Sequence, residues 1–350
     1  MFLPNTYGTA LLLIILSMVC WGSWANMQKL AGKWRFELFY YDYAAGLILT
    51  AVVAAFTFGM LNSSELSFID NLLIAGYRKM AFAVAAGVIF NLANMLLVAA
   101  IALSGLAVAF PVGIGLAMVI GVAANYWLNP QGNPLLLLLG ALLVVLAIIV
   151  DAMAYGALSE ARTERTKDAK AAARAARTKR QKTIKGIAIS LASGVLMGSF
   201  YPLVAVSQEG DNGLAAYTCM LLFAAGVFLS TFVFNVFFLN LPVEGPPMTM
   251  DDYFTGTRKQ HLLGIAGGAI WCTGGLANFL AAGTPPQVNV GPAISYAIGQ
   301  GATLVSALWG LLVWKEFAGA SSRVNLLLGL MIALFVGGLA LLSIAPLFGK

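Results

Sequence analysis

Long apolar stretches separated by short polar connections run through the whole chain. A helix needs roughly 20 mostly apolar residues to cross the hydrocarbon core of a bilayer. Windows of that length identify ten runs: 7–30, 38–60, 81–103, 105–128, 134–156, 184–207, 214–241, 262–283, 290–314 and 325–347. The sequence lacks the period-two alternation of membrane β-barrels. The pattern therefore predicts an all-α membrane protein with ten transmembrane helices.

Composition agrees with this interpretation. The 350 residues are 60% hydrophobic and 10% charged, whereas soluble domains carry about 25% charged residues. The first run lacks a basic leader and is longer than a signal-peptide core, so we interpret it as the first span. The three cysteines lie inside apolar runs, which argues against a disulfide framework.

Basic residues predict the orientation. Ten of the twenty lysines and arginines lie between Arg162 and Lys185, and only Arg78, Lys79 and Lys350 fall outside the odd-numbered loops. The positive-inside rule then places these loops in the cytoplasm of an inner membrane, with both termini outside. The basic segment predicts an orientation anchor and hinge, or alternatively a solvated helix near anionic lipid. The net charge of +6 therefore relates to topology, and we expect no nucleic-acid partner.

An internal repeat is the most informative pattern. Ser17, Val19, Gly22 and Ser23 recur 176 residues later, and the motif from Tyr43 to Gly46 recurs after 180. The offset is 181 for the third and fourth spans and 189 for the fifth. Five spans in each half force the second half to enter the membrane upside down. We predict a 5+5 inverted repeat with the first half at 1–158, a basic linker at 159–183 and the second half at 184–350, the architecture of alternating-access transporters.

Two prolines are candidate helix breaks. Pro111 and Pro292 lie within the fourth and ninth runs, close to several glycines. Proline removes a backbone hydrogen bond, so paired interruptions favour backbone that lines a cavity. Close packing of small residues is the alternative.

Polar and aromatic side chains inside the spans are candidate substrate contacts. Amides and hydroxyls in hydrocarbon are costly unless paired or hydrated, and a deep indole needs a partner for its N–H. Interhelical hydrogen bonding and core packing are the alternatives for each residue singly. We predict substrate contacts from Trp24, Asn91, Asn94, Trp271, Asn278, Tyr296 and Gln300.

Acidic residues are missing from the predicted membrane centre. Asp42, Asp151 and Glu316 are closest to it, and all three lie towards the cytoplasmic ends of their spans. The cargo is therefore expected to be uncharged. If transport is coupled to protons, Asp42 is the best titrating candidate because burial among tyrosines disfavours its charge. A helix cap or an ion pair with Lys29 or Arg35 is the alternative.

Signals of soluble enzymes are absent from the sequence. One histidine, His261, falls in a predicted loop, and neither a phosphate-binding loop nor a metal-spaced cluster occurs. We therefore predict no enzyme activity, no metal and no cofactor.

Several motifs resemble the ureide permease family of the drug/metabolite transporter superfamily. They are Trp21-Gly22-Ser23-Trp24, Lys29-Leu30, Tyr41-Asp42-Tyr43 and Phe56-Thr57-Phe58-Gly59, with a superfamily-like Trp314-Lys315-Glu316 near the other end. The resemblance implies proton-driven uptake of a neutral nitrogen heterocycle such as allantoin or uracil. Relatives that carry glucose, ribose or rhamnose imply a sugar instead. The nucleotide-binding-like motif of the plant central loop is missing here, so regulation by ATP is not expected.

The sequence thus predicts a permease for a small neutral solute in the lipid bilayer. From another class, a membrane scaffold or sensor that transports nothing remains the alternative. It predicts neither paired helix breaks nor a polar cavity.

Overall fold

The computed structural model describes residues 3–61, 66–104, 106–163, 169–242, 245–284, 288 and 290–348, and all the regular structure in these ranges is helical. Nine helices in them are long and apolar enough to cross a membrane, and Val112–Leu128 is a shorter apolar helix. The described part is thus an all-helical, multi-pass membrane fold. The count of ten spans stays a prediction.

The first part of the chain, up to the linker, forms a bundle of long helices with short ones between them. Its elements are α1 (Tyr7–Ser23), α2 (Ala25–Leu30), α3 (Phe36–Phe56), the 3-10 turn η1 (Phe58–Met60), α4 (Phe68–Ile74), α5 (Tyr77–Ser104), α6 (Leu106–Leu128) and α7 (Pro134–Thr163).

The second part repeats this alternation of long and short helices. Its elements are α8 (Ala169–Gln208), α9 (Ala216–Asn240), α10 (Met250–Phe254), α11 (Arg258–Ala282), α12 (Pro292–Gly299), α13 (Ala302–Leu308), the π-helical turn η2 (Trp309–Val313), α14 (Ser322–Ile344) and the 3-10 turn η3 (Ala345–Phe348).

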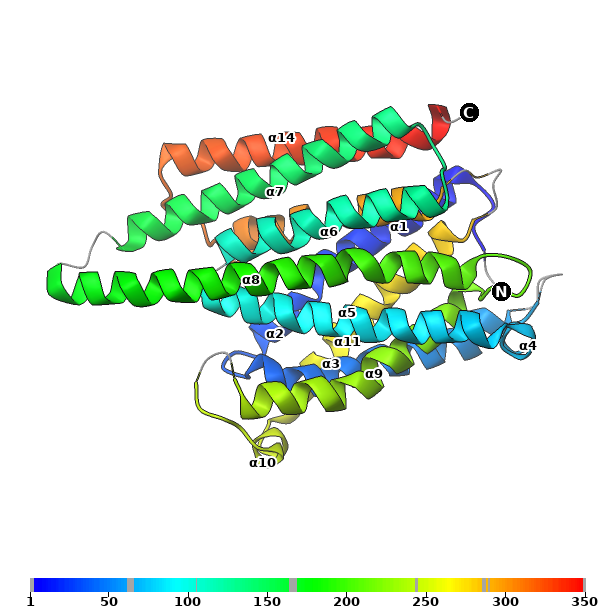
Figure 1. The fold of residues 1–350 in the computed structure, drawn as a ribbon, viewed down its shortest axis with the longest axis horizontal. Helices are drawn as coiled ribbons and strands as arrows, with labels where there is room; N and C mark the ends of the chain where they lie inside the picture. Colours follow the sequence, from blue (N-terminus) through cyan, green and yellow to red (C-terminus); the bar gives the residue numbers. More distant parts are fainter. Residues whose placement is uncertain are drawn as a thin grey trace.

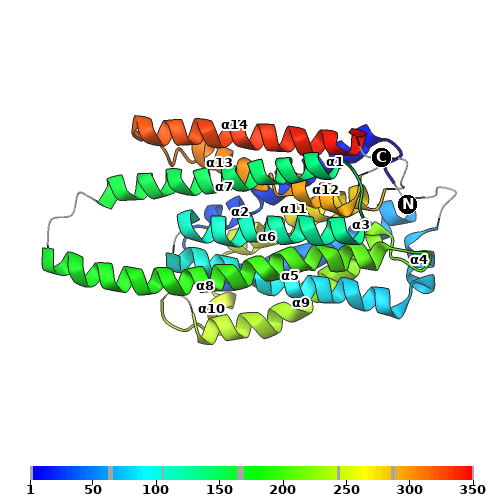
Figure 2. The same cartoon turned by 45° about the horizontal axis from the view of Figure 1, so that its top comes forward.

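The long helices lie roughly side by side, so the bundle has two ends (Figure 1). Both termini and α4 lie at one end, which we call the terminal end. The α7–α8 connection and α10 lie at the other, which we call the linker end, and there α8 extends well beyond α5 (Figures 1 and 2). The predicted basic linker is therefore largely a continuation of α7 and α8, with residues 164–168 outside the described part.

Helices of one half pack mainly on helices of the other. In the first half α5 packs on α8 and α9, and in the second half α11 packs on α1 and α3. At the edge of the bundle α7 lies along α14 (Figure 2). These pairings correspond to one another under the repeat predicted from the sequence, because α5 and α11 are both third spans of their halves.

Two glycine contacts bring these helices together. A Cβ atom on Gly46 of α3 would lie 2.0 Å from the carbonyl oxygen of Ile265, and one on Gly268 of α11 would lie 1.9 Å from that of Tyr43. The corresponding positions behave alike, since a Cβ on Gly226 or Gly87 would lie 2.3 or 2.1 Å from a carbonyl of the facing helix. Each close helix approach therefore requires glycine.

The two prolines do not act as paired helix breaks. Pro292 is the first residue of α12, a position that has no backbone hydrogen bond to lose. The helix is instead interrupted at Gln300 and Gly301, between α12 and α13. Helix α6 continues through Pro111, whose side chain lies outside the described part.

Candidate functional site

A cavity of about 840 Å³ lies between the two halves. Its walls come from α1, α2, α3, α5, α6, α7, α8, α11, α13 and η2, and from the segments that join α2 to α3 and follow η2. At the linker end its lining includes the exposed Lys29 and Lys33, and deeper in the bundle it includes the buried Phe90 and Trp271. The cavity is thus reached from the linker end and ends inside the bundle.

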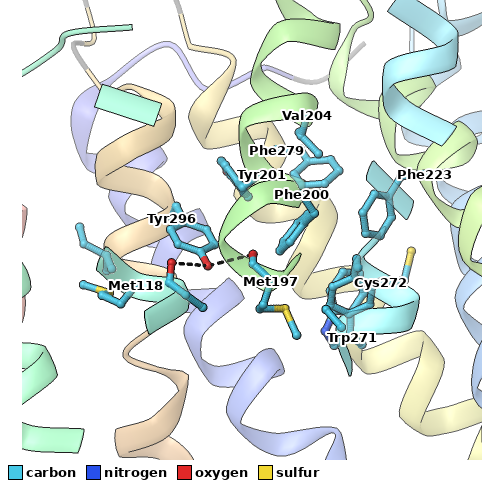
Figure 3. Close-up of a cluster of buried hydrophobic side chains, with 14 of the residues drawn as sticks. Met118, Met197, Phe200, Tyr201, Val204, Phe223, Trp271, Cys272, Phe279 and Tyr296 are labelled. Carbon is cyan, nitrogen blue, oxygen red and sulfur yellow. Dashed lines mark hydrogen bonds between the residues drawn. The ribbon is translucent and has the colours of Figure 1, made fainter. Parts of the chain in front are cut away.

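Aromatic rings form the inner end of the cavity. Trp271 stacks on Trp21 with ring centroids 5.6 Å apart and an interplanar angle of 19°. The ring centroid of Phe90 lies 4.4 Å from that of Trp271. Phe223 also stacks on Trp271, with ring centroids 5.7 Å apart. Figure 3 shows Phe200, Phe223 and Trp271 in this cluster, carried by different helices. The inner wall therefore offers flat apolar surfaces suited to a ring.

Two amide side chains interrupt this aromatic surface. Asn94 donates from Nδ2 to the Tyr40 hydroxyl at 3.0 Å, which leaves its carbonyl oxygen available as an acceptor. The amide of Gln300 lines the cavity where α12 ends. Among the described residues it has no hydrogen-bond partner, so it can both donate and accept.

Two indoles lie beside these amides. Nε1 of Trp21 is buried without a hydrogen-bond partner among the described residues, although the ring lines the cavity. Trp24 also lines the cavity, at the junction of α1 and α2, and packs on Tyr43 with centroids 4.9 Å apart. These two residues therefore offer the cavity their ring surfaces, while the N–H of Trp21 is buried away from it.

Four of the seven predicted contact residues, namely Trp24, Asn94, Trp271 and Gln300, line the cavity. The other three do not. Asn91 is fully buried and donates to the Val227 carbonyl and to two hydroxyl groups on α9. In this structure it joins α5 to α9, and the sequence could not distinguish it from Asn94 because both lie on one helix face.

Asn278 and Tyr296 lie in a buried polar layer beyond the cavity, towards the terminal end. Asn278 donates to the Ser17 hydroxyl and to the Ser295 carbonyl, each at 3.1 Å, and its own carbonyl oxygen accepts from Tyr201 and Ser295. Figure 3 shows the Tyr296 hydroxyl between two backbone carbonyls. Both carbonyls, of Ala117 and Met197, lie at 3.3 Å. This layer separates the cavity from the terminal end.

Asp42 lies outside the cavity in a cluster of its own. It is 4% exposed, accepts from Tyr253 at 2.7 Å and lies 2.8 Å from Nδ1 of His261. The two basic residues named above as alternative ion-pair partners of Asp42 bind other acids: Lys29 pairs with Glu316, and Arg35 pairs with Glu37.

His261 is thus a functional candidate that the sequence did not identify. It was expected in a loop, but it lies in the first turn of α11, where a capping box at Thr257 begins the helix. The sequence contained a signal for this helix start, because Thr257 is followed three residues later by Gln260, the spacing of a capping box.

Polar groups also form the wall of the cavity near the linker end. Asp151 and Tyr155 lie one turn apart on α7, and both line the cavity with Glu316. The Tyr155 hydroxyl donates to Glu316 at 2.9 Å. The sequence identified the two acids only as charges near span ends, because it could not place α7 beside the segment that follows η2.

Comparisons with known proteins agree on one family. The family model described as Ureide permease matches residues 39–180 and 168–345. Ureide permease 2 of Arabidopsis thaliana is 26% identical over 400 residues, covering 98% of each chain. Ureide permease 1 of the same plant is 24% identical and also covers 98% of each chain. Probable ureide permease A3 of Vigna unguiculata is 23% identical over 92% of this chain and 99% of its own.

A solved crystal structure has a similar arrangement of the chain. It aligns with a TM-score of 0.60 over 95% of this chain and 96% of its own, at 18% identity. At this identity the likeness shows the fold alone.

Proposed function

Because the chain belongs to the ureide permease family, whose members are transporters and not enzymes, we propose that it is a secondary active transporter for a small uncharged ureide or nucleobase such as allantoin or uracil. The family match covers almost the whole chain. The proposal extends it to a substrate, a site and a mechanism.

The amides beside stacked indoles carry the proposal. Ureides and nucleobases combine a small ring with alternating carbonyl acceptors and N–H donors. Gln300 offers both kinds of group and Asn94 offers an acceptor, while the rings of Trp24 and Trp271 line the same space. Buried polar groups of this kind reject ligands that leave them unpaired.

The inner end of the cavity supports an uncharged cargo. The charged side chains of the lining are Lys29, Lys33, Arg35, Glu37, Asp151 and Glu316. All six belong to the wall near the linker end, while the inner residues described above are aromatic or amide. A charged solute there would lack a counter-charge.

A sugar cargo is less well supported than a ureide. The relatives reported above are named ureide permeases. An aromatic face suits a sugar too, so the substrate test includes glucose.

The packing of the two halves supports alternating access. Corresponding helices of the halves make corresponding contacts, including the glycine contacts at Gly46 and Gly226, as an inverted repeat requires. The cavity is open at one end and closed at the other by the layer around Asn278. With the orientation predicted from the basic loops, the open side faces the cytoplasm of an inner membrane.

Coupling to protons completes the proposal. Asp42 is the candidate predicted from the sequence, but it lies outside the cavity and both of its carboxylate oxygens have protein partners, Tyr253 and His261. The cavity wall offers a second carboxyl group, which is argued below.

Counterflow into proteoliposomes tests the substrate. Vesicles loaded with unlabelled allantoin, uracil or glucose receive the labelled solute outside, so exchange requires binding and transport but no driving ion. We expect exchange of allantoin or uracil, and a fall of about tenfold or more in affinity for Gln300→Ala and Asn94→Ala, since one lost hydrogen bond to a buried polar group costs about 1–3 kcal/mol.

Asn240→Ala is the matched control, because this amide is exposed and outside the cavity. Exchange of glucose alone would contradict the ureide assignment. Equal affinities in all three variants would show that the substrate does not bind at Gln300 and Asn94 in the cavity.

A further inference from the structure

We propose that Asp151 is the carboxyl group that binds and releases the coupling proton, and that the Lys29–Glu316 ion pair beside it links its protonation to the packing of the cavity wall. This inference rests on the proposed function as a proton-coupled transporter. It assigns the proton to a residue that faces the substrate cavity.

Asp151 is a buried acid with an unsatisfied oxygen. Its side chain is 3% exposed, and Oδ1 has no hydrogen-bond partner among the described residues. It lies about 10 Å along α7 from the end of the span at Leu158, at 1.5 Å per residue. A charged carboxylate in this position is costly, and a bound proton removes the cost.

The charged groups around Asp151 strengthen this argument. Glu316 is near enough to act on it electrostatically, and Tyr155 on the same helix lies within reach of both acids. The neighbouring helices bring little compensation. In the described part α6 has one ionisable side chain, Tyr126, which lies near the terminal end, and Arg323 at the start of α14 is exposed. Of these two neighbouring acids, only Glu316 forms an ion pair with a cation among the described residues.

That cation is Lys29. It forms an ion pair with Glu316 and lies 4.4 Å from the ring centroid of Trp314. Glu316 accepts from Tyr155 as well, so its charge is compensated whereas that of Asp151 is not. Of the two acids, Asp151 is therefore the one that gains most from a proton.

The segment that carries Glu316 has an unusual backbone. The π-helical turn η2 ends at Val313, and Lys315 adopts a φ of 51°, which a residue with a side chain rarely does. This turn brings the backbone N–H of Glu316 to the Gly310 carbonyl at 2.9 Å. A Cβ on Gly310 would lie 2.9 Å from the Glu316 carboxylate and 3.1 Å from the Tyr155 hydroxyl. Local strain and π-turns concentrate at functional sites.

The proton step is simple in chemical terms. An O–H bond forms between a carboxylate oxygen of Asp151 and a proton from cavity water, and the same bond breaks when the proton returns to water. Once the proton has left, the charged Asp151 repels Glu316, which is the partner of Lys29. Because Lys29 belongs to α2 and Glu316 follows η2, loss of the proton changes how both segments pack on α7.

Asp151 differs from Asp42 in the two properties that a carrier needs. Asp151 lines the cavity and has an unused oxygen, whereas both oxygens of Asp42 have partners outside it. Asp42 remains the sequence-based candidate, so the experiment compares the two.

The test measures two kinds of transport in proteoliposomes. Counterflow needs no driving ion, and accumulation is driven by an imposed pH gradient. We expect Asp151→Asn to keep counterflow within about threefold of wild type and to lose accumulation. Asp42→Asn and the exposed control Glu209→Gln should keep both, and Asp151→Glu should restore accumulation. Accumulation by Asp151→Asn, or its loss in Asp42→Asn alone, would overturn the proposal.

Infrared difference spectroscopy on the purified protein separates this proposal from the substrate assignment. A pH jump should reveal a titrating protonated carboxyl band that disappears in Asp151→Asn and shifts in frequency in Asp151→Glu. The band requires no substrate, so it decides the role of Asp151 even if no ureide is transported. An identical band in wild type and both variants would contradict the assignment, and Asp151→Glu keeps the test decisive if Asp151→Asn does not fold.

Discussion

The imidazole Nδ1 of His261 lies 2.8 Å from Oδ2 of Asp42, across the contact between α11 and α3. Tyr253 of α10 donates to the other carboxylate oxygen, and Trp34 packs edge-on against His261 with centroids 5.4 Å apart. One buried acid of α3 therefore holds the consecutive elements α10 and α11, more than 200 residues away in the sequence, at the linker end.

Removal of the Tyr253 hydroxyl group from this cluster should lower the stability of the protein. Tyr253→Phe leaves one oxygen of Asp42 without its donor, which should lower the free energy of unfolding by about 1–2 kcal/mol. Thermal unfolding in detergent measures the effect. Tyr77→Phe is the control because Tyr77 is 90% exposed, and an equal effect of the two substitutions would contradict the role of the hydrogen bond.

The same hydroxyl predicts a dependence on pH. Burial, followed by the bond to Asp42, raises the pKa of Tyr253 above its ordinary value. The folded state therefore keeps this proton when the unfolded state loses it. The resulting stability is complete below about pH 10 and is lost as the pH rises further. Tyr253→Phe should lose less stability than wild type between neutral pH and about pH 11, and parallel curves would argue against it.

The glycine contact between α11 and α3 predicts a large effect from one methyl group. In Gly268→Ala the new Cβ would lie 1.9 Å from the Tyr43 carbonyl oxygen, so the helices must separate, at a cost of about 1–3 kcal/mol or more. Gly87→Ala should behave similarly in the other half.

Gly329→Ala is the matched control for these variants. It lies within α14 and has no atom within 4 Å of an added Cβ, so the higher helix propensity of alanine should leave stability unchanged or slightly raised. Melting temperatures that are equal in Gly268→Ala and Gly329→Ala would show that the close contact is absent.

Accessibility to thiol reagents should follow the cavity wall. In a background without the native cysteines, Asn94→Cys and Gln300→Cys should react with a small water-soluble methanethiosulfonate, because both positions line the cavity. Asn91→Cys and Asn278→Cys should react much more slowly, because both positions are fully buried. Rates measured by mass spectrometry test this order. Unreactive cysteines at all four positions would contradict both the cavity and the transporter mechanism.

Hydropathy predicted the all-helical, multi-pass membrane fold, because the ability of a helix to span a bilayer depends on its local composition. Gly46 and Gly226, or Gly87 and Gly268, could be paired from the sequence alone, and they make corresponding contacts in the structure. Helix ends were less predictable. Pro292 begins a helix rather than breaking one, because its effect depends on where the preceding loop ends.

The site was only partly predictable for a different reason. Spacing places Asn91 and Asn94 on one helix face, but the neighbouring helices decide that one binds α9 and the other faces the cavity. Asp151, Glu316 and His261 were all visible in the sequence. Their importance arises from partners more than 100 residues away, which no local pattern contains.

The layer around Asn278 closes one end of the cavity with hydrogen bonds set among packed aromatic rings, such as Tyr201 against Tyr296 with centroids 5.0 Å apart. Opening this end has to separate buried polar groups, and each group left without a partner costs about 1–3 kcal/mol. Under the alternating-access mechanism proposed above, the layer is therefore the barrier whose opening limits turnover.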